Sequence, residues 1–247
     1  MAIKNAVVAF ALLTAAANAA PVDGPERHEF AFARLEYRGC NSGWDFQFPP
    51  WATDYPKADE QFILGVRRLA NLDIYPRAHV VRIGDELHRY PFLYAVEVGN
   101  MCLTDIEAAQ LARVLDGRGG FLMVDDFWGE LQWDQFAGQM AKVLPGRPIR
   151  ELPMSHPVFR SFYDVRETVQ IPNIIQALAG GSTAECEGCE HRVYGIEDER
   201  GRLVVLILHN TDLGDAWEWA ENPYFPLAMS NYAFKMGINA IVYAMTH

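Results

Sequence analysis

Basic residues are scarce in this chain of 247 residues. Its 21 lysines and arginines stand against 32 aspartates and glutamates, which gives a formal net charge of −11. No Lys/Arg cluster is larger than pairs such as Arg67-Arg68. A protein that binds nucleic acid or anionic lipid needs a basic face to displace counterions. The composition therefore predicts no nucleic-acid partner and no electrostatic attachment to lipid.

Motifs of several large enzyme classes are missing. The chain has no G-x-S-x-G nucleophile elbow, no G-x-x-x-x-G-K-[ST] phosphate loop and no H-E-x-x-H zinc motif. The glycine-rich segment Gly117-Arg118-Gly119-Gly120 precedes an apolar run instead of following one, so it does not fit a dinucleotide-binding loop. Nucleotide hydrolysis and hydride transfer are both disfavoured.

A long apolar run occurs only at the N-terminus, over residues 6–17. It follows the single cation Lys4 and leads into Ala17-Asn18-Ala19, whose small residues suit a signal peptidase. The run is shorter than the roughly 20 residues of a membrane span. We expect residues 1–19 to be a secretory signal peptide and residues 20–247 to form one periplasmic or secreted domain without a membrane span.

Cysteines are few, at positions 40, 102, 186 and 189. In an oxidising compartment an even number favours disulfides, with three connectivities open. The segment Cys186-Glu187-Gly188-Cys189 permits three interpretations: a short structural disulfide, half of a metal site together with His191, or a thioredoxin-like redox pair. A redox pair is expected at the start of a helix after a strand, and zinc needs two further ligands.

Hydrophobic periodicity predicts alternating strands and helices. We expect strands over residues 28–37, 78–83, 92–98, 121–124, 192–196 and 203–208, and helices over residues 59–69, 104–115, 131–144 and 230–243. The first strand alternates and is predicted to be half-buried near a sheet edge, whereas 78–83, 92–98 and 121–124 are predicted to be buried. Residues 44–51 are predicted to form an aromatic-rich surface loop, and residues 160–190 show mixed patterns.

This order of elements predicts an α/β fold with a largely parallel sheet and helices on both faces. Ligands of such folds bind beyond the carboxyl ends of the strands. Asp125 and Asp126 follow the most apolar strand, and adjacent carboxylates there would bind protons or cations. They could act as a general base or as ligands of a hard cation. Alternatively, one caps a helix and the other holds a loop.

A second acidic and aromatic group follows the strand that ends at residue 208. If that strand is parallel to the central one, His209 and Asp212 could meet Asp125 or Asp126 as an acid/base pair or as metal ligands. Alternatively, His209 is a hydrogen-bonded structural residue, and Asp212 and Asp215 are turn or helix-cap residues.

Aromatic side chains accompany the acids, as in Asp54-Tyr55 and Trp217-Glu218. Such a combination suits sugar rings, whose C–H faces pack on aromatic rings while their hydroxyls bond to carboxylates. Packing of these aromatics in the core under long loops is the alternative.

The segment Gly119-Gly120-Phe121-Leu122-Met123-Val124-Asp125-Asp126-Phe127-Trp128-Gly129 resembles the bacterial family catalogued as domain of unknown function 4159. Further similar segments lie at residues 32–35, 51–59, 90–94, 156–157, 212–218 and 243–247. That family resembles the class I glutamine amidotransferase-like superfamily, which implies a three-layer, flavodoxin-like fold. The superfamily's nucleophilic cysteine lies at a strand-to-helix elbow, where this chain has Asp125 and Asp126. The resemblance therefore does not imply glutaminase activity.

The leading hypothesis is an exported protein that binds a ligand, with carbohydrates or cell-wall fragments as the first class to test. Its predicted site comprises Asp54, Tyr55, Asp125, Asp126, Trp128, Asp212, Asp215, Trp217 and Glu218. A hydrolase using a divalent metal or paired carboxylates, with Asp125 or Asp126 as base and His209 as its partner, is one alternative. A non-catalytic assembly protein that binds a protein partner is the other.

Overall fold

The computed structural model describes residues 24–40, 49–84, 86–117 and 119–247. The predicted signal peptide, residues 1–19, and the first part of the predicted aromatic loop, residues 44–48, lie outside the described residues. Within the described part of the chain, no helix is both long enough and apolar enough to cross a membrane.

Seven strands form one sheet in the order β2-β1-β3-β4-β7-β6-β5. Strands β1, β2, β3, β4 and β7 run parallel, and β6 is antiparallel to both of its neighbours. The bounds are β1 (Ala33–Glu36), β2 (His79–Arg82), β3 (Phe92–Val96), β4 (Phe121–Asp125), β5 (Arg150–Glu151), β6 (Arg192–Glu197) and β7 (Leu203–His209). The predicted α/β class with a mostly parallel sheet is confirmed.

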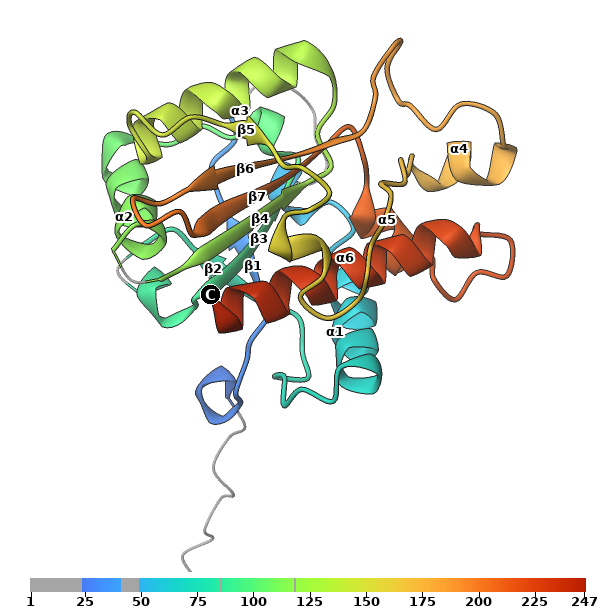
Figure 1. Cartoon of the computed structure of the whole chain (residues 1–247), viewed down its shortest axis with the longest axis horizontal. Helices are drawn as coiled ribbons and strands as arrows, with labels where there is room; N and C mark the ends of the chain where they lie inside the picture. Colours follow the sequence, from blue (N-terminus) through green and yellow to red (C-terminus); the bar gives the residue numbers. More distant parts are fainter. Residues whose placement is uncertain (1–23, 41–48, 85, 118) are drawn as a thin grey trace, which may run out of the picture.

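Helices cover the sheet on both sides, with α2 and α3 on one face and α1 and α6 on the other (Figure 1). The α-helices are α1 (Lys57–Leu69), α2 (Asp105–Leu115), α3 (Gly129–Val143), α4 (Ile174–Ala179), α5 (Leu213–Glu218) and α6 (Leu227–Thr246). Short 3-10 helices are η1 (Pro25–Arg27), η2 (Pro50–Ala52), η3 (Leu87–Arg89), η4 (Val98–Asn100) and η5 (Pro157–Phe159).

The buried side chains form two hydrophobic clusters, one on each face of the sheet. Successive side chains of a strand point to opposite faces. In β4, Phe121 and Met123 join the cluster of α1, α5 and α6, whereas Leu122 and Val124 join that of α2 and α3. The same alternation directs Asp125, the last residue of β4, toward the α5 and α6 face.

Two predictions with strong local signals are confirmed. The α2 helix has the predicted capping box, in which Thr104 Oγ1 accepts a hydrogen bond from the Glu107 backbone N–H at 3.2 Å and Glu107 Oε2 accepts one from the Thr104 N–H at 2.8 Å. The predicted hairpin is the antiparallel pair β6–β7.

Three predicted placements in the N-terminal part of the chain are wrong. Strand β1 is interior, between β2 and β3, and its polar residue Arg34 is fully buried because it is paired with Asp59. Strand β2 is instead the edge strand and is only partly buried. Leu69, predicted on the buried stripe of its helix, is 50% exposed.

Several predicted boundaries move by a few residues. Helix α1 begins at Lys57, two residues before Asp59, because Asp59 lies in the first turn and binds Arg34 instead of capping the helix. Helices α3 and α6 begin at Gly129 and Leu227, before the predicted starts at 131 and 230. Residues 160–190 contain the short helix α4 and are otherwise irregular.

Candidate functional site

The carboxyl ends of β3, β4 and β7 are linked by backbone hydrogen bonds. Glu97 N–H donates to Asp126 O at 2.9 Å, and Asp126 N–H donates to Thr211 O at 3.1 Å. The residues just after these strands, Glu97, Asp126 and Asn210, all have left-handed φ values of 54°, 50° and 59°. Such conformations are uncommon outside glycine and cluster at functional sites. They turn the chain sharply and bring acidic side chains together at this edge.

Asp125 anchors this edge of the sheet to α5. Its Oδ2 accepts hydrogen bonds from Tyr94 Oη at 3.0 Å, Leu213 N–H at 2.8 Å and Gly214 N–H at 3.2 Å, whereas its buried Oδ1 has no partner. Burial raises the pKa of Asp125 to about 7, against the effect of these hydrogen bonds. The loop-holding role anticipated for one of the two aspartates therefore fits Asp125.

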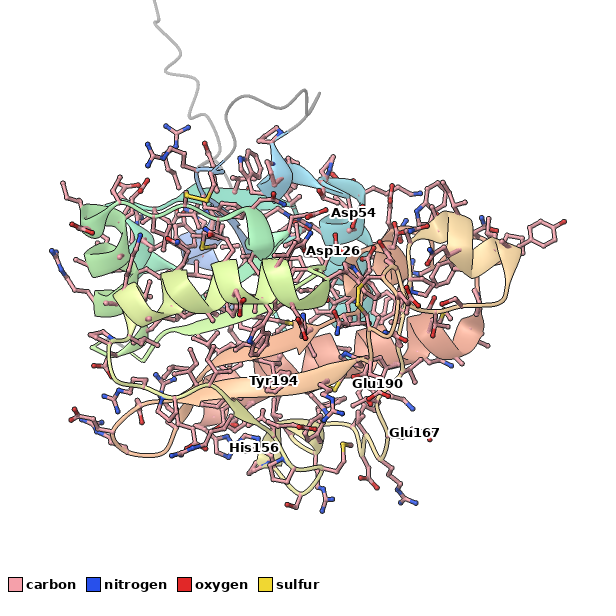
Figure 2. The ribbon with its side chains drawn as sticks, turned by 90° about the horizontal axis from the view of Figure 1, so that it is seen from above. Asp54, Asp126, His156, Glu167, Glu190 and Tyr194 are labelled. Atoms are coloured by element: carbon pink, nitrogen blue, oxygen red, sulfur yellow. A yellow bond between two sulfur atoms is a disulfide. The ribbon has the colours of Figure 1, made fainter. Side chains whose placement is uncertain are left out.

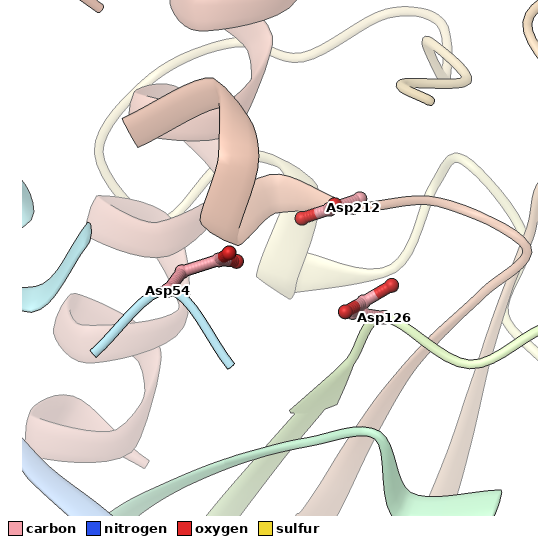
Figure 3. A group of neighbouring side chains, drawn as sticks. All are labelled: Asp54, Asp126 and Asp212. Atoms are coloured by element: carbon pink, nitrogen blue, oxygen red, sulfur yellow. The ribbon is translucent and has the colours of Figure 1, made fainter. Parts of the chain in front are cut away.

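Asp126, Asp54 and Asp212 bring their carboxyl groups to one place, and their oxygens lie within 4.8 Å of one another. Figure 3 shows Asp54 and Asp212 directing their carboxyl groups toward the space between the three residues. We call these three residues the aspartate triad. They come from the loop before α1, the end of β4 and the N-cap of α5.

The electrostatics of the triad disfavour three negative charges. Burial raises the pKa of Asp126 and of Asp212 well above the usual range, and neighbouring carboxylates raise both further. The pKa of Asp54 is also raised by burial and by Asp215, while the Arg34 guanidinium opposes the change. Closely spaced buried carboxylates need protons or a cation. The triad can therefore bind a cation or share protons.

One carboxylate oxygen of the triad has no hydrogen-bond donor, although other oxygens of the triad do. Asp126 Oδ1 accepts from Trp128 Nε1 at 3.1 Å, and Asp212 Oδ1 accepts from the Asp215 backbone N–H at 2.7 Å. Asp54 Oδ2 is buried and has no hydrogen-bond partner. A buried polar atom without a partner is costly and points to a missing ligand or ion.

A second acidic group shares Asp54 and adds Asp215 and Glu218. Here the carboxylates already have partners. Both Asp215 oxygens accept hydrogen bonds, from Ile174 N–H and from Trp219 Nε1, and Lys57 Nζ lies 3.9 Å from Glu218 Oε1. The structure thus places the predicted residues Asp215 and Glu218 beside the triad but supplies them with partners, so we assign the ligand site to the triad.

The aromatic residues of the prediction separate into two kinds. Tyr55 and Trp128 are partly exposed and lie next to triad residues in the chain, and the indole of Trp128 donates to Asp126. Trp217 is fully buried and stacks on Phe62 with ring centroids 4.1 Å apart. Trp217 is therefore a core residue, in agreement with the alternative of core packing.

His209 lies away from the triad. Its ring packs against Phe127, Trp133 and Tyr194, and its Nε2 lies 3.3 Å from the Gly129 carbonyl oxygen. Tyr194 and the labelled Asp54 and Asp126 are well separated in Figure 2. Burial lowers the pKa of His209 to about 4. Strand β7 is parallel to β4, as the hypothesis required, but the geometry does not bring His209 to Asp125 or Asp126 as an acid/base partner.

Sequence reasoning missed several residues of the site. Glu97 and Glu185 carry carboxylates whose charges raise the pKa of Asp126. Gly214 lies under the triad, where a Cβ would be 2.5 Å from Asp54 Oδ2. A charged residue directly after a buried strand was the available signal for Glu97, but the apolar residue Val98 extended the predicted strand past it.

The four cysteines lie in two pairs at disulfide distance, Cys40–Cys102 and Cys186–Cys189. The structure does not support the interpretation of Cys186 and Cys189 as half of a metal site with His191. The two ring nitrogens of His191 lie 2.8 Å from His209 O and 3.0 Å from Tyr232 Oη, so they are already occupied.

A comparison with models of known protein families shows to which family the chain belongs. The family described as domain of unknown function (DUF4159) matches residues 31–245. The chain belongs to this family. A comparison with curated proteins found no match. The matched region of this DUF4159 domain contains the triad and both cysteine pairs.

Proposed function

We propose that this DUF4159 domain binds a divalent cation through Asp54, Asp126 and Asp212 and uses the ion to hold an oxygen-rich ligand, such as a carbohydrate or a cell-wall fragment. Two observations on Asp54 carry the proposal: its buried Oδ2 has no hydrogen-bond partner, and one of its carboxylate oxygens lies within 4.8 Å of an oxygen from each of the other two aspartates. A cation there would supply the missing partner and offset the repulsion between the carboxylates.

The donor set favours a hard cation. All three ligands are carboxylate oxygens, which suit Ca²⁺, Mg²⁺ or Mn²⁺, whereas softer metals prefer sulfur or imidazole. Ca²⁺ takes six to eight oxygens at about 2.3–2.6 Å, so its ligands can lie up to about 5 Å apart. Three aspartates would leave coordination positions open for the hydroxyl oxygens of a ligand.

Two partly exposed aromatic side chains support a sugar as the ligand. Tyr55 directly follows Asp54, and Trp128 is held to Asp126 by its indole N–H. An aromatic ring beside an ion would pack on the C–H face of a pyranose while the ion binds hydroxyls.

Metal-assisted hydrolysis is the second candidate. The observation that favours it is a pair of carboxylates outside the triad, Glu97 and Glu185, whose charges raise the pKa of Asp126. An ion can activate a bound water, and a carboxylate outside its ligand set can take the proton. Release of a product from a glycan would distinguish this candidate from simple binding.

The proposal includes a flavodoxin-like, glutamine-amidotransferase-like scaffold in an exported protein. The parallel strands, the two helical faces and a site at the carboxyl ends of the strands support this scaffold. The strand-to-helix elbow after β4 holds Asp125 and Asp126 in place of a nucleophilic cysteine. The two cysteine pairs are compatible with an oxidising, extracellular compartment.

The test is thermal unfolding of the chelator-treated protein with added Ca²⁺, Mg²⁺ or Mn²⁺. An ion at a hundred times its Kd stabilises by about 2.7 kcal/mol, which raises the Tm of a domain of this size by roughly 5–10 °C. Asp54→Asn should abolish the shift, and Asp215→Asn should keep it. Glycan binding measured by calorimetry should then require the ion.

Each outcome has a definite meaning. If none of the three ions shifts the Tm of the wild type, or if Asp54→Asn keeps the shift, the triad is not a cation site. If an ion binds at the triad but no glycan binds with it, the cation site stands and the ligand class is wrong.

A further inference from the structure

We propose that the Cys186–Cys189 disulfide is a thiol–disulfide exchange site that reacts with a dithiol of a partner protein. The inference is independent of the cation site. It starts from the position of the two cysteines, which are among the residues that line an open pocket of about 520 Å³. Both cysteines are partly exposed, so a thiolate could reach them.

The sulfur atoms lie against the first residue of α3. If Gly129 carried a Cβ, it would be 3.5 Å from Cys186 Sγ and 3.8 Å from Cys189 Sγ. Helix α3 has 15 residues, and the N-terminus of such a helix favours negative charge. A redox pair is expected at the start of a helix that follows a strand. Here the cysteines lie instead beside the start of α3, a helix that is distant from them in the sequence.

The bond is not needed to hold its own loop. Gln170 Nε2 donates to Cys189 O at 2.7 Å, and Asn210 Nδ2 donates to Glu190 O at 2.8 Å. On the other side of the pair, Asn173 N–H donates to Glu185 Oε1 at 2.7 Å. These contacts remain when the disulfide opens. A cross-link over a sequence separation of 3 also restricts the unfolded chain little.

The second disulfide also joins two partly exposed cysteines, but it closes a much longer loop, so it serves as an internal control. Cys40–Cys102 spans a sequence separation of 62 and joins the segments that follow β1 and β3. Backbone N–H groups of Cys40 and Cys102 donate across this junction to Asn100 O and Arg38 O at 2.9 and 2.8 Å. Gln135 Nε2 donates to Cys40 Sγ at 2.9 Å.

The exchange proceeds in two balanced steps. A partner thiolate attacks Cys189 Sγ, the bond between the two cysteines breaks, and Cys186 leaves as a thiolate beside the start of α3 and then takes a proton. The second partner thiol, as its thiolate, attacks the mixed disulfide and releases Cys189, which is also protonated. Two electrons and two protons pass to the cysteine pair, and the partner dithiol becomes a disulfide.

Charge around the pocket restricts the partner. Glu130, Glu187 and Glu190 line it together with a single arginine, Arg192, which already pairs with Glu190 and with Glu151. The residual charge is negative and repels anionic thiols. A partner dithiol set in a neutral or basic surface fits this pocket, whereas glutathione, which carries a net negative charge, does not. Figure 2 labels Glu190, one of the three glutamates that line this pocket.

The experiment is a titration of the native protein with dithiothreitol, followed by alkylation and mass spectrometry of each cysteine. We expect Cys186 and Cys189 to become alkylated at a dithiol concentration at least tenfold lower than Cys40 and Cys102, with the near-UV circular dichroism retained. At equal thiolate concentration, mercaptoethanol should open the pair several times faster than glutathione. In the Glu187→Gln/Glu190→Gln variant, the rates of reaction with mercaptoethanol and with glutathione should be closer to each other.

Two results would overturn the inference. The first is that Cys186–Cys189 opens no earlier than Cys40–Cys102, or opens only when the protein unfolds, which would show a structural disulfide. The second is that glutathione and mercaptoethanol react equally fast in the wild type, which would remove the charge argument for a protein partner.

Discussion

Arg34 and Asp59 form an ion pair in which both side chains are completely buried. Arg34 Nε donates to both carboxylate oxygens of Asp59 at 3.0 and 3.1 Å, and Nη2 donates to Oδ1. Arg34 Nη1 also donates to the carbonyl oxygens of Trp51 and Thr53, at 3.2 and 2.8 Å. One interior strand residue thereby fixes α1 and the loop that carries Asp54.

Asp59→Asn should destabilise the protein by about 3–5 kcal/mol, because removal of one partner leaves the Arg34 charge buried without compensation. The same change should weaken ion binding, since Asp59 no longer holds the Arg34 guanidinium, whose Nη1 anchors the loop before Asp54. Chemical denaturation reports the first effect, and ion titration of the folded variant reports the second.

Two variants control for the effect of charge alone. Arg34→Met/Asp59→Leu removes both charges and should be more stable than Asp59→Asn. Arg82→Gln breaks the exposed pair that Arg82 makes with Glu36, also on β1, and should leave the denaturation midpoint unchanged. An Asp59→Asn midpoint equal to that of the wild type would contradict the role assigned to the buried pair.

Gly214→Ala should lower ion affinity at least tenfold without unfolding the protein. The new Cβ would lie 2.5 Å from Asp54 Oδ2 and 3.3 Å from Asp212 Oδ1, so the triad would have to move. Calorimetric titration with Ca²⁺ measures the affinity. Gly138→Ala is the matched control: its Cβ meets open space on α3, so it should leave affinity unchanged and add about 0.5–1 kcal/mol of stability. Unchanged affinity in Gly214→Ala would mean that this contact does not position Asp54.

Local signals explain which parts of the fold were predictable. The capping box of α2 and the apolar run of β4 depend on neighbouring residues and were identified from the sequence. The burial of Arg34 depends on Asp59, 25 positions further along the chain. Without that contact, the alternation around Arg34 indicates a half-exposed strand, which is why β1 was predicted near the edge.

The sequence predicted that the site lies at the carboxyl ends of the strands, but it did not predict which side chains point into the site. Asp125, Asp126 and Asp212 lie at the predicted carboxyl ends because β4 and β7 are parallel, and Asp54 joins them from the loop before α1. The register pairs Val124 with Ile207, which places His209 on the opposite face from Asp125. Register is a tertiary property, and a shift of one residue would have reversed this result.

Trp217→Ala should destabilise the protein by about 3–5 kcal/mol, because it leaves a cavity beside Phe62 and Tyr94 in the core. The folded fraction should retain its ion affinity. Trp128→Phe keeps an aromatic ring at a partly exposed position and loses the hydrogen bond to Asp126, so it should cost less stability and alter ion binding instead. Denaturation and ion titration of both variants make the comparison. Trp217→Phe keeps an aromatic ring at this position and removes less volume than Trp217→Ala. A loss of ion affinity in this milder variant, measured on its folded fraction, would show that Trp217 belongs to the site.

The ion-free protein should be most stable in acidic solution. Burial raises the pKa of Asp125 and Glu97 to about 7 and that of Asp215 to about 6. A carboxyl group with a raised folded-state pKa contributes stability that is fully present below its unfolded value of about 4 and is lost as the pH rises through the folded value. Burial lowers the pKa of His191 and His209 to about 4, so their contribution is lost as the pH falls from about 6.5 toward 4.

The two trends oppose each other between about pH 4 and 6.5, but three carboxyl groups act against two histidines, so the Tm of the chelated protein should fall as the pH rises from about 4 toward 8. Asp125→Asn should flatten that decline, because the asparagine has no proton to lose. Protons and the cation compete for the same carboxylates, so the rise in Tm caused by Ca²⁺ should be largest at pH 8 and shrink toward pH 5. Thermal unfolding across this range, with chelator and with Ca²⁺, measures both slopes. A chelated protein that is most stable at pH 8 would show that these carboxyl groups are not held protonated by burial, and the electrostatic reason for a cation at the triad would then be lost.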